Sequence, residues 1–191
     1  MKNNNIKKLV GSVSIIIGTL LVALLLNSFV IQAYEVDGMS MEPTLKSGDR
    51  LVIWKLKSTI GKHSSIGYVP KRGDIVVISH TAGLEKISYI KRVIGLPGER
   101  VKVSAGKMTI YNSRYPGGLD PDDITDYGKY LESTFGELEI KVGKNSIFVV
   151  GDNRLKGGSI DSRSDLGLVD LKSIEGKLSL RLYPINKIKR F

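Results

Sequence analysis

An uncharged apolar run near the N-terminus limits what this chain can fold into. Residues 9–26, LVGSVSIIIGTLLVALLL, contain no charged side chain. As an α-helix, such a run rises about 27 Å at about 1.5 Å per residue, close to the ~30 Å hydrocarbon core of a bilayer. Together with the mostly apolar residues that follow, it predicts a transmembrane anchor over residues 9–33.

The charges on either side of the run predict the orientation of the anchor. Lys2, Lys7 and Lys8 precede it, whereas Glu35 and Asp37 follow it. By the positive-inside rule, residues 1–8 lie in the cytoplasm and residues 34–191 form an extracytoplasmic domain. The alternative is a cleaved signal peptide, but the apolar cores of signal peptides are usually shorter, at about 7–15 residues.

Composition narrows the possible partners and chemistry. The net charge of +10 suits nucleic acid or an anionic membrane surface. No zinc-finger or RNA-binding motif supports nucleic acid, so membrane lipids are the expected partner. The chain has no cysteine, which excludes disulfides, thiol catalysis and thiolate metal sites.

The sequence after the anchor predicts a mostly β domain of short strands. Its apolar runs are short, rich in β-branched residues and separated by Gly, Pro, Asp and Asn: RLVIWKL, GDIVVISH, SYIKRVIG, ERVKVS, KMTIYN, LEIKV, SIFVVGD and KLSLRLYPI. The only soluble helix that we predict covers residues 124–135. The acidic segment 118–126 lacks EF-hand spacing, so we interpret it as a solvated loop.

The stretch VDGMSMEPTL, residues 36–45, places Ser40 between two methionines. A nucleophilic serine needs a base, and the only histidines, His63 and His80, lack the context of a familiar triad motif. A lysine can serve if burial lowers its pKa from about 10.4. In SYIKRVIG, strand alternation puts Lys91 on one face with Tyr89 and a valine. The alternative is that Lys91 and its neighbouring arginine form an exposed basic pair on an edge strand.

Four motifs occur in order behind the apolar run: GMSMEPTL, KRGDIVVI, YIKRVIGLPGE, and GDNR followed by SIDSR. In this order they resemble the type I signal peptidases, membrane-bound Ser-Lys proteases, of the kind found in Gram-positive bacteria. The resemblance runs from about residue 36 to 163 and is interrupted by a variable insertion at about 103–144. It implies a signal-peptidase-like fold of largely antiparallel strands.

The resemblance implies a role for each matching residue. Ser40 would be the nucleophile and Lys91 the general base. Tyr89, Ile78 and Val149 would enclose the lysine, and Ser159 would hydrogen-bond to it. Asp161 and Arg163 would form a supporting ion pair, and residues 151–153 a turn beside the site. No metal and no cofactor is implied, and the substrates would be the signal peptides of preproteins.

Two departures from the family pattern bear on these roles. Four residues rather than two separate GDNR from Ser159, and the pair Gly157 and Gly158 can form a bulge that restores the position of the serine. Gly38 stands where some members have a serine that supplies a hydroxyl to the oxyanion hole, so the backbone N–H of Ser40 would be the main donor. The first departure leaves one alternative function, a catalytically impaired adaptor in surface-protein or pilus assembly.

Overall fold

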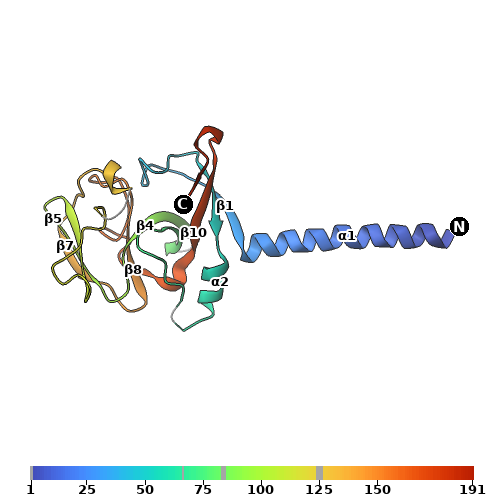
Figure 1. Cartoon of the computed structure of the whole chain (residues 1–191), viewed down its shortest axis with the longest axis horizontal. Coiled ribbons are helices and arrows are strands. Elements are labelled where there is room, and N and C mark those ends of the chain that lie inside the picture. The colour runs from blue at the N-terminus through green and yellow to red at the C-terminus, as the bar shows by residue number, and fades with distance from the viewer. Residues whose placement is uncertain (1, 66, 83–84, 124–126) are drawn as a thin grey trace.

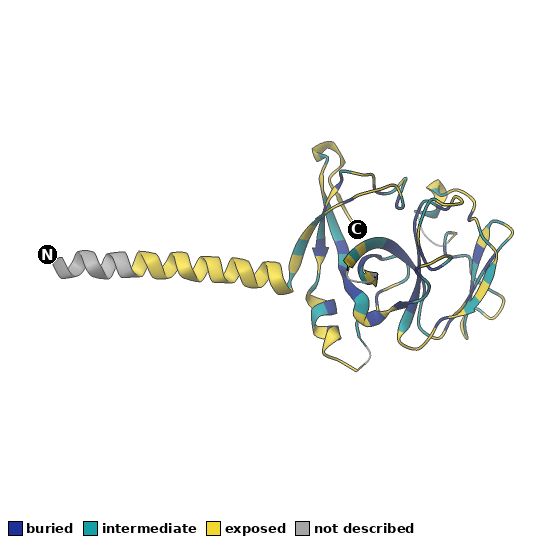
Figure 2. Ribbon diagram, turned by 180° about the vertical axis from the view of Figure 1, so that it is seen from behind, coloured by how far each residue is buried: buried dark blue, intermediate teal, exposed yellow. Residues whose placement is uncertain are grey.

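A long N-terminal helix projects from a β-sheet domain (Figure 1). The computed structural model describes residues 2–65, 67–82, 85–123 and 127–191. Helix α1 covers Lys2–Phe29, and its part Gly11–Phe29 is long and apolar enough to cross a membrane. This part is exposed along its length (Figure 2), and its last residue, Phe29, accepts a hydrogen bond from the domain, from the hydroxyl of Thr59. The helix ends four residues before the predicted end of the anchor at residue 33, because the chain continues as strand β1, Ile31–Glu35.

Two antiparallel sheets make up the domain. The larger sheet has the strand order β1, β2 (Arg50–Trp54), β10 (Ile174–Tyr183), β3 (Ile75–Ala82), β4 (Glu85–Gly95), β8 (Ser146–Val150) and β9 (Val169–Asp170), with β11 (Lys189–Arg190) paired to β10. The smaller sheet has the order β6 (Lys107–Tyr111), β5 (Arg100–Ser104) and β7 (Leu138–Lys141). Each predicted run contains a strand, so the predicted mostly β fold with an N-terminal apolar helix is confirmed.

Strand β4 lies between β3 and β8, and its side chains enter different hydrophobic clusters. On one face, Val93 belongs to a cluster that we call cluster A, with Val76, Ile78, Ile147, Val149, Leu166, Val169, Leu171 and Ile174. On the other face, Ile94 packs with residues of the smaller sheet, including Val101, Met108 and Ile110. The predicted alternation along β4 is therefore present, and it places Lys91 on the same face as cluster A.

The segment that carries Ser40 is fixed by apolar side chains on both sides of it. Val36, Met41 and Leu45 are buried in a third cluster, with Leu51, Ile53, Ile75, Val77 and Leu178. Met39, in contrast, is 64% exposed. The two methionines beside Ser40 thus have different roles, since Met41 anchors the segment and Met39 points to solvent.

The helix predicted over residues 124–135 is wrong for the part of it that the structure describes. Residues 124–126 lie outside the described residues, and residues 127–135 contain only the 3-10 turn η1, Gly128–Tyr130. A Cβ atom at Gly128 would lie 1.9 Å from the carbonyl oxygen of Asp122. The segment also bonds to Arg154 through Thr134 and Phe135. These tertiary contacts outweigh a weak local helix propensity.

A short helix that was not predicted, α2, covers Leu56–Lys62. Its sequence, LKSTIGK, contains β-branched residues and a glycine, which are poor helix formers. Tertiary contacts hold it in place. The hydroxyl of Ser58 donates to the carbonyls of Lys55 and Glu175, and a Cβ at Gly61 would lie only 2.5 Å from the backbone nitrogen of Tyr68.

The two methionines beside Ser40 provide a matched test of this packing. We expect Met41→Ala to lower the free energy of unfolding by about 2–5 kcal/mol, because it leaves a cavity in a closed core. Met39→Ala is expected to change it by less than about 0.5 kcal/mol, because the side chain is exposed. Urea unfolding of both full-length variants in detergent measures the difference, and equal losses would contradict the packing described here.

Candidate active site

Ser40 and Lys91 are in contact beside strand β4, at the point where the buried part of the strand begins. The Nζ atom of Lys91 lies 2.7 Å from the Oγ atom of Ser40, although fifty-one positions separate the two residues in sequence. Lys91 is only 2% exposed. The alternative of an exposed basic pair is therefore wrong for this lysine, because it is enclosed between β3 and β8.

Apolar surroundings make Lys91 an unusual lysine. The ring of Tyr89 lies with its centroid 5.6 Å from Nζ, while Ile78 and Val149 belong to cluster A on the same face. Burial lowers the pKa of Lys91 from 10.5 to about 8, although the nearby charges of Asp161 and Asp152 oppose this effect. At pH 7, about one molecule in ten then carries the neutral amine, which can accept a proton.

The neighbouring residue on β4 has a different environment. The guanidinium of Arg92 points to the opposite face, where it donates to both carboxylate oxygens of Asp152 at 2.7 and 2.5 Å. It also donates to the carbonyl of Gly73 at 2.8 Å. Arg92 is thus paired with a carboxylate, whereas Lys91 bonds through its amine to an uncharged hydroxyl. Sequence reasoning missed the pair with Asp152, because its members lie sixty positions apart.

Backbone contacts fix the position of Ser40. Its carbonyl accepts a hydrogen bond from the backbone N–H of Asn153 at 3.1 Å, and the side chain of Asn153 donates to the carbonyl of Met39 at 3.3 Å. Within the described residues, nothing accepts a hydrogen bond from the backbone N–H of Ser40. This donor is therefore available to an external oxyanion. The turn at residues 151–153 lies beside the site, as the sequence predicted.

Gly38 adds no second donor to this arrangement. Its φ of 89° lies in the left-handed region that L side chains rarely adopt. A Cβ placed there meets nothing within 4 Å, so space is available but the backbone conformation is unfavourable for serine. Position 38 therefore supplies no side-chain hydroxyl, and the backbone N–H of Ser40 is the candidate oxyanion donor.

The predicted ion pair of Asp161 and Arg163 is present and buried. The Nη2 atom of Arg163 lies 2.8 Å from one carboxylate oxygen of Asp161, and its Nε atom lies 3.0 Å from the other. Burial raises the pKa of Asp161, but hydrogen bonds and charge from Arg163 outweigh it and hold that pKa below its usual value. Asp161 also accepts a hydrogen bond from the backbone N–H of Gly151, and so connects the pair to the site.

Ser159 lies beside the site without the predicted hydrogen bond to Lys91. A Cβ at Gly151 would lie 2.3 Å from both the Oγ of Ser159 and the carbonyl oxygen of Ser40, which places the three residues together. The Ser159 hydroxyl is buried and bonds to no described residue. The longer spacing before it is taken up by a turn closed from the N–H of Gly158 to the carbonyl of Leu155. Gly157 has a left-handed φ of 73° in this turn.

Among the described residues, neither histidine is hydrogen-bonded to Ser40 or Lys91. His63 is exposed, and the ring of His80 lies 6.1 Å from that of Tyr89. Among the residues that the structure describes, no group of three or more acidic or histidine side chains is placed to hold a metal ion. The acidic residue Asp122, in the segment predicted to be a solvated loop, instead pairs with the buried Arg154.

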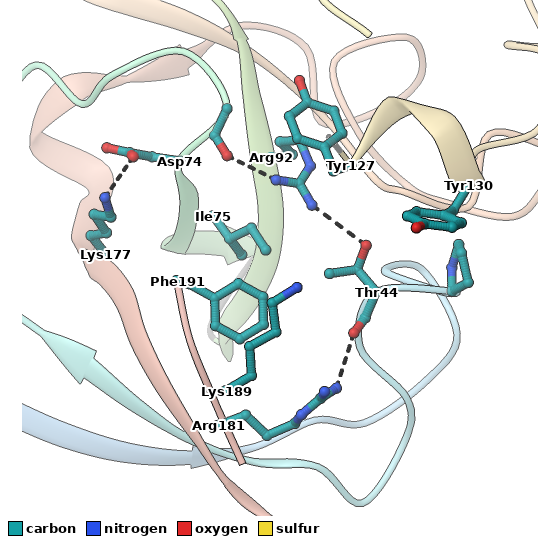
Figure 3. Close-up of a pocket in the computed structure, with 12 residues that line it drawn as sticks. Thr44, Asp74, Ile75, Arg92, Tyr127, Tyr130, Lys177, Arg181, Lys189 and Phe191 are labelled. Atoms are coloured by element: carbon teal, nitrogen blue, oxygen red, sulfur yellow. Dashed lines mark hydrogen bonds and ion pairs between the residues drawn. The ribbon is translucent and has the colours of Figure 1, made fainter. Parts of the chain in front are cut away.

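A cavity of about 740 Å³ lies on the Arg92 side of β4 (Figure 3). It is separate from the Ser40–Lys91 pair and is lined by Pro43, Thr44, Gly73, Asp74, Ile75, Arg92, Tyr127, Tyr130, Lys177, Arg181, Lys189 and Phe191. Three of its cations are paired, Arg92 with Asp152, Lys177 with Asp74 and Arg181 with Asp49. Arg92 and Arg181 both bond to Thr44, so the cavity wall supports the Ser40 segment.

Comparison with known proteins identifies the family of this chain. The family model described as signal peptidase, peptidase S26, matches residues 9–183. The chain belongs to this family. It is 36% identical to signal peptidase I of Bacillus licheniformis over 182 residues, which is 93% of this chain and 90% of that protein. It is also 36% identical to signal peptidase I T of Bacillus subtilis over 178 residues, which is 92% of this chain and 86% of that protein.

A crystal structure of a signal peptidase I from Enterococcus faecalis is also similar, with 28% identity and a TM-score of 0.44. It covers 58% of this chain and 97% of that one. Family membership rests on the sequence matches, which span almost the whole chain. As a member of a peptidase family, this chain is a serine peptidase.

The burial of Lys91 predicts a pH-dependent effect on stability. Because the pKa is lower in the folded state, the unfolded chain binds more protons between pH 8 and 10.5, and stability rises with pH across this window. We expect Lys91→Met to raise the free energy of unfolding at pH 7 by about 3 kcal/mol, a gain that disappears towards pH 10.5. Urea unfolding of full-length protein at several pH values measures this. The exposed control Lys144→Met is expected to show no comparable gain.

Proposed function

We propose that this chain is a membrane-anchored peptidase that removes signal peptides from preproteins with a Ser40–Lys91 dyad. The observation that carries the proposal is the 2.7 Å contact between Nζ of Lys91 and Oγ of Ser40, with the lysine almost fully buried. Family membership supports the substrate class, since the relatives are signal peptidases I. The adaptor alternative lacks support, because both members of the dyad are present and in contact.

The proposed reaction uses groups of this chain only. The neutral amine of Lys91 takes the proton of the Ser40 hydroxyl, and Oγ attacks the carbonyl carbon at the end of the signal peptide. The backbone N–H of Ser40 stabilises the oxyanion, to which one such donor contributes about 3–4 kcal/mol in a known protease. The protonated Lys91 then gives its proton to the leaving amine. Water hydrolyses the acyl-enzyme, with Lys91 again as the base.

The supporting residues hold this arrangement in the proposal. Tyr89 shields the amine from water, which keeps the pKa of Lys91 low. Asp161 and Arg163 fix the turn at Gly151, against which both Ser40 and Ser159 lie. Their role is positioning, because neither side chain is hydrogen-bonded to the Ser40 hydroxyl or the Lys91 amine among the described residues.

We expect Ser40→Ala and Lys91→Ala each to lower kcat/KM for preprotein cleavage by at least about 10³-fold, because each removes a reacting group. His80→Ala is expected to keep activity within a few-fold. In the wild type, kcat/KM should rise with pH to a plateau, with its acidic midpoint near pH 8, because only neutral Lys91 is active. The assay is cleavage of a preprotein in detergent. Substantial activity in a correctly folded Lys91→Ala protein would refute the mechanism.

Ser159 provides a separate test of positioning. Its buried hydroxyl has unused hydrogen-bonding capacity, and we propose that it accepts a hydrogen bond from Lys91 once the amine is protonated. Ser159→Ala should then lower kcat about tenfold with little change in KM, while the free energy of unfolding stays within about 1 kcal/mol. Steady-state kinetics together with urea unfolding separate these effects. An unchanged kcat would remove Ser159 from the site.

We propose that residues 1–8 are cytoplasmic and that the catalytic domain is extracytoplasmic, from the charges that flank the apolar run. Because the chain has no cysteine, one introduced residue reports its own location. A membrane-impermeant maleimide added to intact bacterial spheroplasts or protoplasts should label Lys144→Cys and leave Asn3→Cys unlabelled. The reverse pattern would contradict the proposed orientation.

A further inference from the structure

A second cavity of about 740 Å³ lies near the loop that carries the additional residues before Ser159. It is lined by Gly106, Ser133, Thr134, Phe135, Gly136, Glu137, Leu155 and Lys156. Phe135 and Leu155 supply large apolar surfaces and are 53% and 56% exposed. The ammonium of Lys156 lies 5.6 Å from the centroid of the Phe135 ring. Exposed apolar side chains that face one cavity are typical of a binding surface rather than of a solvated loop.

Hydrogen bonds connect the cavity to the nucleophile. The backbone N–H of Asn153 donates to the carbonyl of Ser40 at 3.1 Å, and Leu155 follows two residues later. The Cα atoms of Asn153 and Leu155 are thus at most about 7 Å apart. The backbone N–H of Phe135 donates to the carbonyl of Arg154 at 3.0 Å, which fixes the opposite wall of the cavity to the same segment. An extended peptide at Ser40 reaches this wall within a few residues, at about 3.3 Å per residue.

The cavity lies on the side of the domain away from the membrane helix. Its wall includes Gly106, in the turn between β5 and β6, and Glu137, directly before β7. The labels of β5 and β7 lie at the end of the molecule opposite to α1 (Figure 1). A signal peptide held in the bilayer enters from the side of α1. The chain after the cleavage site must then leave towards the smaller sheet.

We propose that this cavity is a subsite for the mature part of the substrate, which takes an apolar or aromatic side chain at the second to fourth residue after the cleavage site. The inference rests on the proposed peptidase function. Phe135 and Leu155 contact the incoming side chain, and the alkyl part of Lys156 covers it. The turn at residues 155–158, longer than the family pattern, presents Leu155 and Lys156 to the cavity and still returns the chain to Ser159.

The first experiment uses wild-type enzyme and a set of preproteins that differ only after the cleavage site. One has glycine and serine at the first five mature positions, and five others have a single phenylalanine at one of these positions. We expect kcat/KM to be about five- to tenfold higher with phenylalanine at one of positions two to four. Equal cleavage of all six overturns the subsite and leaves the peptidase intact, whereas cleavage of none contradicts the proposed function itself.

The second experiment assigns the preference to the cavity. In the double variant Phe135→Ala and Leu155→Ala, the ratio of kcat/KM for the best phenylalanine substrate to that for the glycine–serine substrate should fall to about two or less. The glycine–serine substrate should still be cleaved. Tyr130→Ala is the matched control, because this tyrosine is 75% exposed and lies in the other cavity; it should retain the full preference. A preference retained in the double variant overturns the assignment.

The remaining alternative for this apolar surface is contact with lipid. In that case the double variant would bind phosphatidylglycerol vesicles more weakly than Tyr130→Ala and would cleave all six substrates with the same proportional loss. This result would overturn the subsite. If the double variant does not fold, Leu155→Ser alone and the wild-type substrate series decide the question, because the series needs no substitution.

Discussion

One costly arrangement constrains the rest of the structure: a lysine amine is enclosed in apolar surroundings and bonded to a serine hydroxyl. Lys91 lies on a central strand, between β3 and β8, and its face of the sheet is filled by cluster A. Keeping a protonated amine there costs about 3 kcal/mol at neutral pH, a large part of the ordinary stability of a domain. A rigid two-sided core is therefore a condition for the chemistry, because a looser fold would let water reach the amine and restore its usual pKa.

The other buried charges near the site show why Lys91 alone is suited to act as a base. Arg92 is paired with Asp152, Arg154 with Asp122, and Arg163 with Asp161. In each pair, the opposite charge compensates the loss of hydration. Lys91 has no such direct partner among the described residues, only the hydroxyl of Ser40. The contrast between paired and unpaired cations therefore distinguishes Lys91, the proposed base, from the paired arginines around it.

The sequence predicted those parts of the molecule that depend on local pattern. Strand alternation correctly placed Lys91 on one face with Tyr89 and Val93, since the period of two is set by backbone geometry alone, but it left open whether that face is buried. Gly128 and the Arg154 contacts, in contrast, prevent a helix over residues 127–135 through neighbours distant in sequence, and α2 forms because Ser58 and Gly61 meet other elements. Whether the hydroxyl of Ser159 has a hydrogen-bond partner depends on how the longer turn closes. The hydrophobic periodicity of the sequence gives no information on this closure. The pairing of Arg92 with Asp152 can likewise be predicted only when the strand order is known, because it depends on β4 and β8 being neighbours.

In the proposed mechanism, the anchor also offsets the incomplete deprotonation of the lysine base. At neutral pH only about a tenth of the molecules carry the reactive amine, so the rate from free encounter with a soluble substrate would be low. Strand β1 and a few further residues connect α1 directly to the Ser40 segment, and that segment is fixed by Met41 and Leu45. If the substrate is held in the same bilayer, its effective concentration at Ser40 reaches about the millimolar range. In this proposal, the segment between α1 and Ser40 contributes to catalysis, because its short path limits which bond of a membrane-held substrate meets the serine.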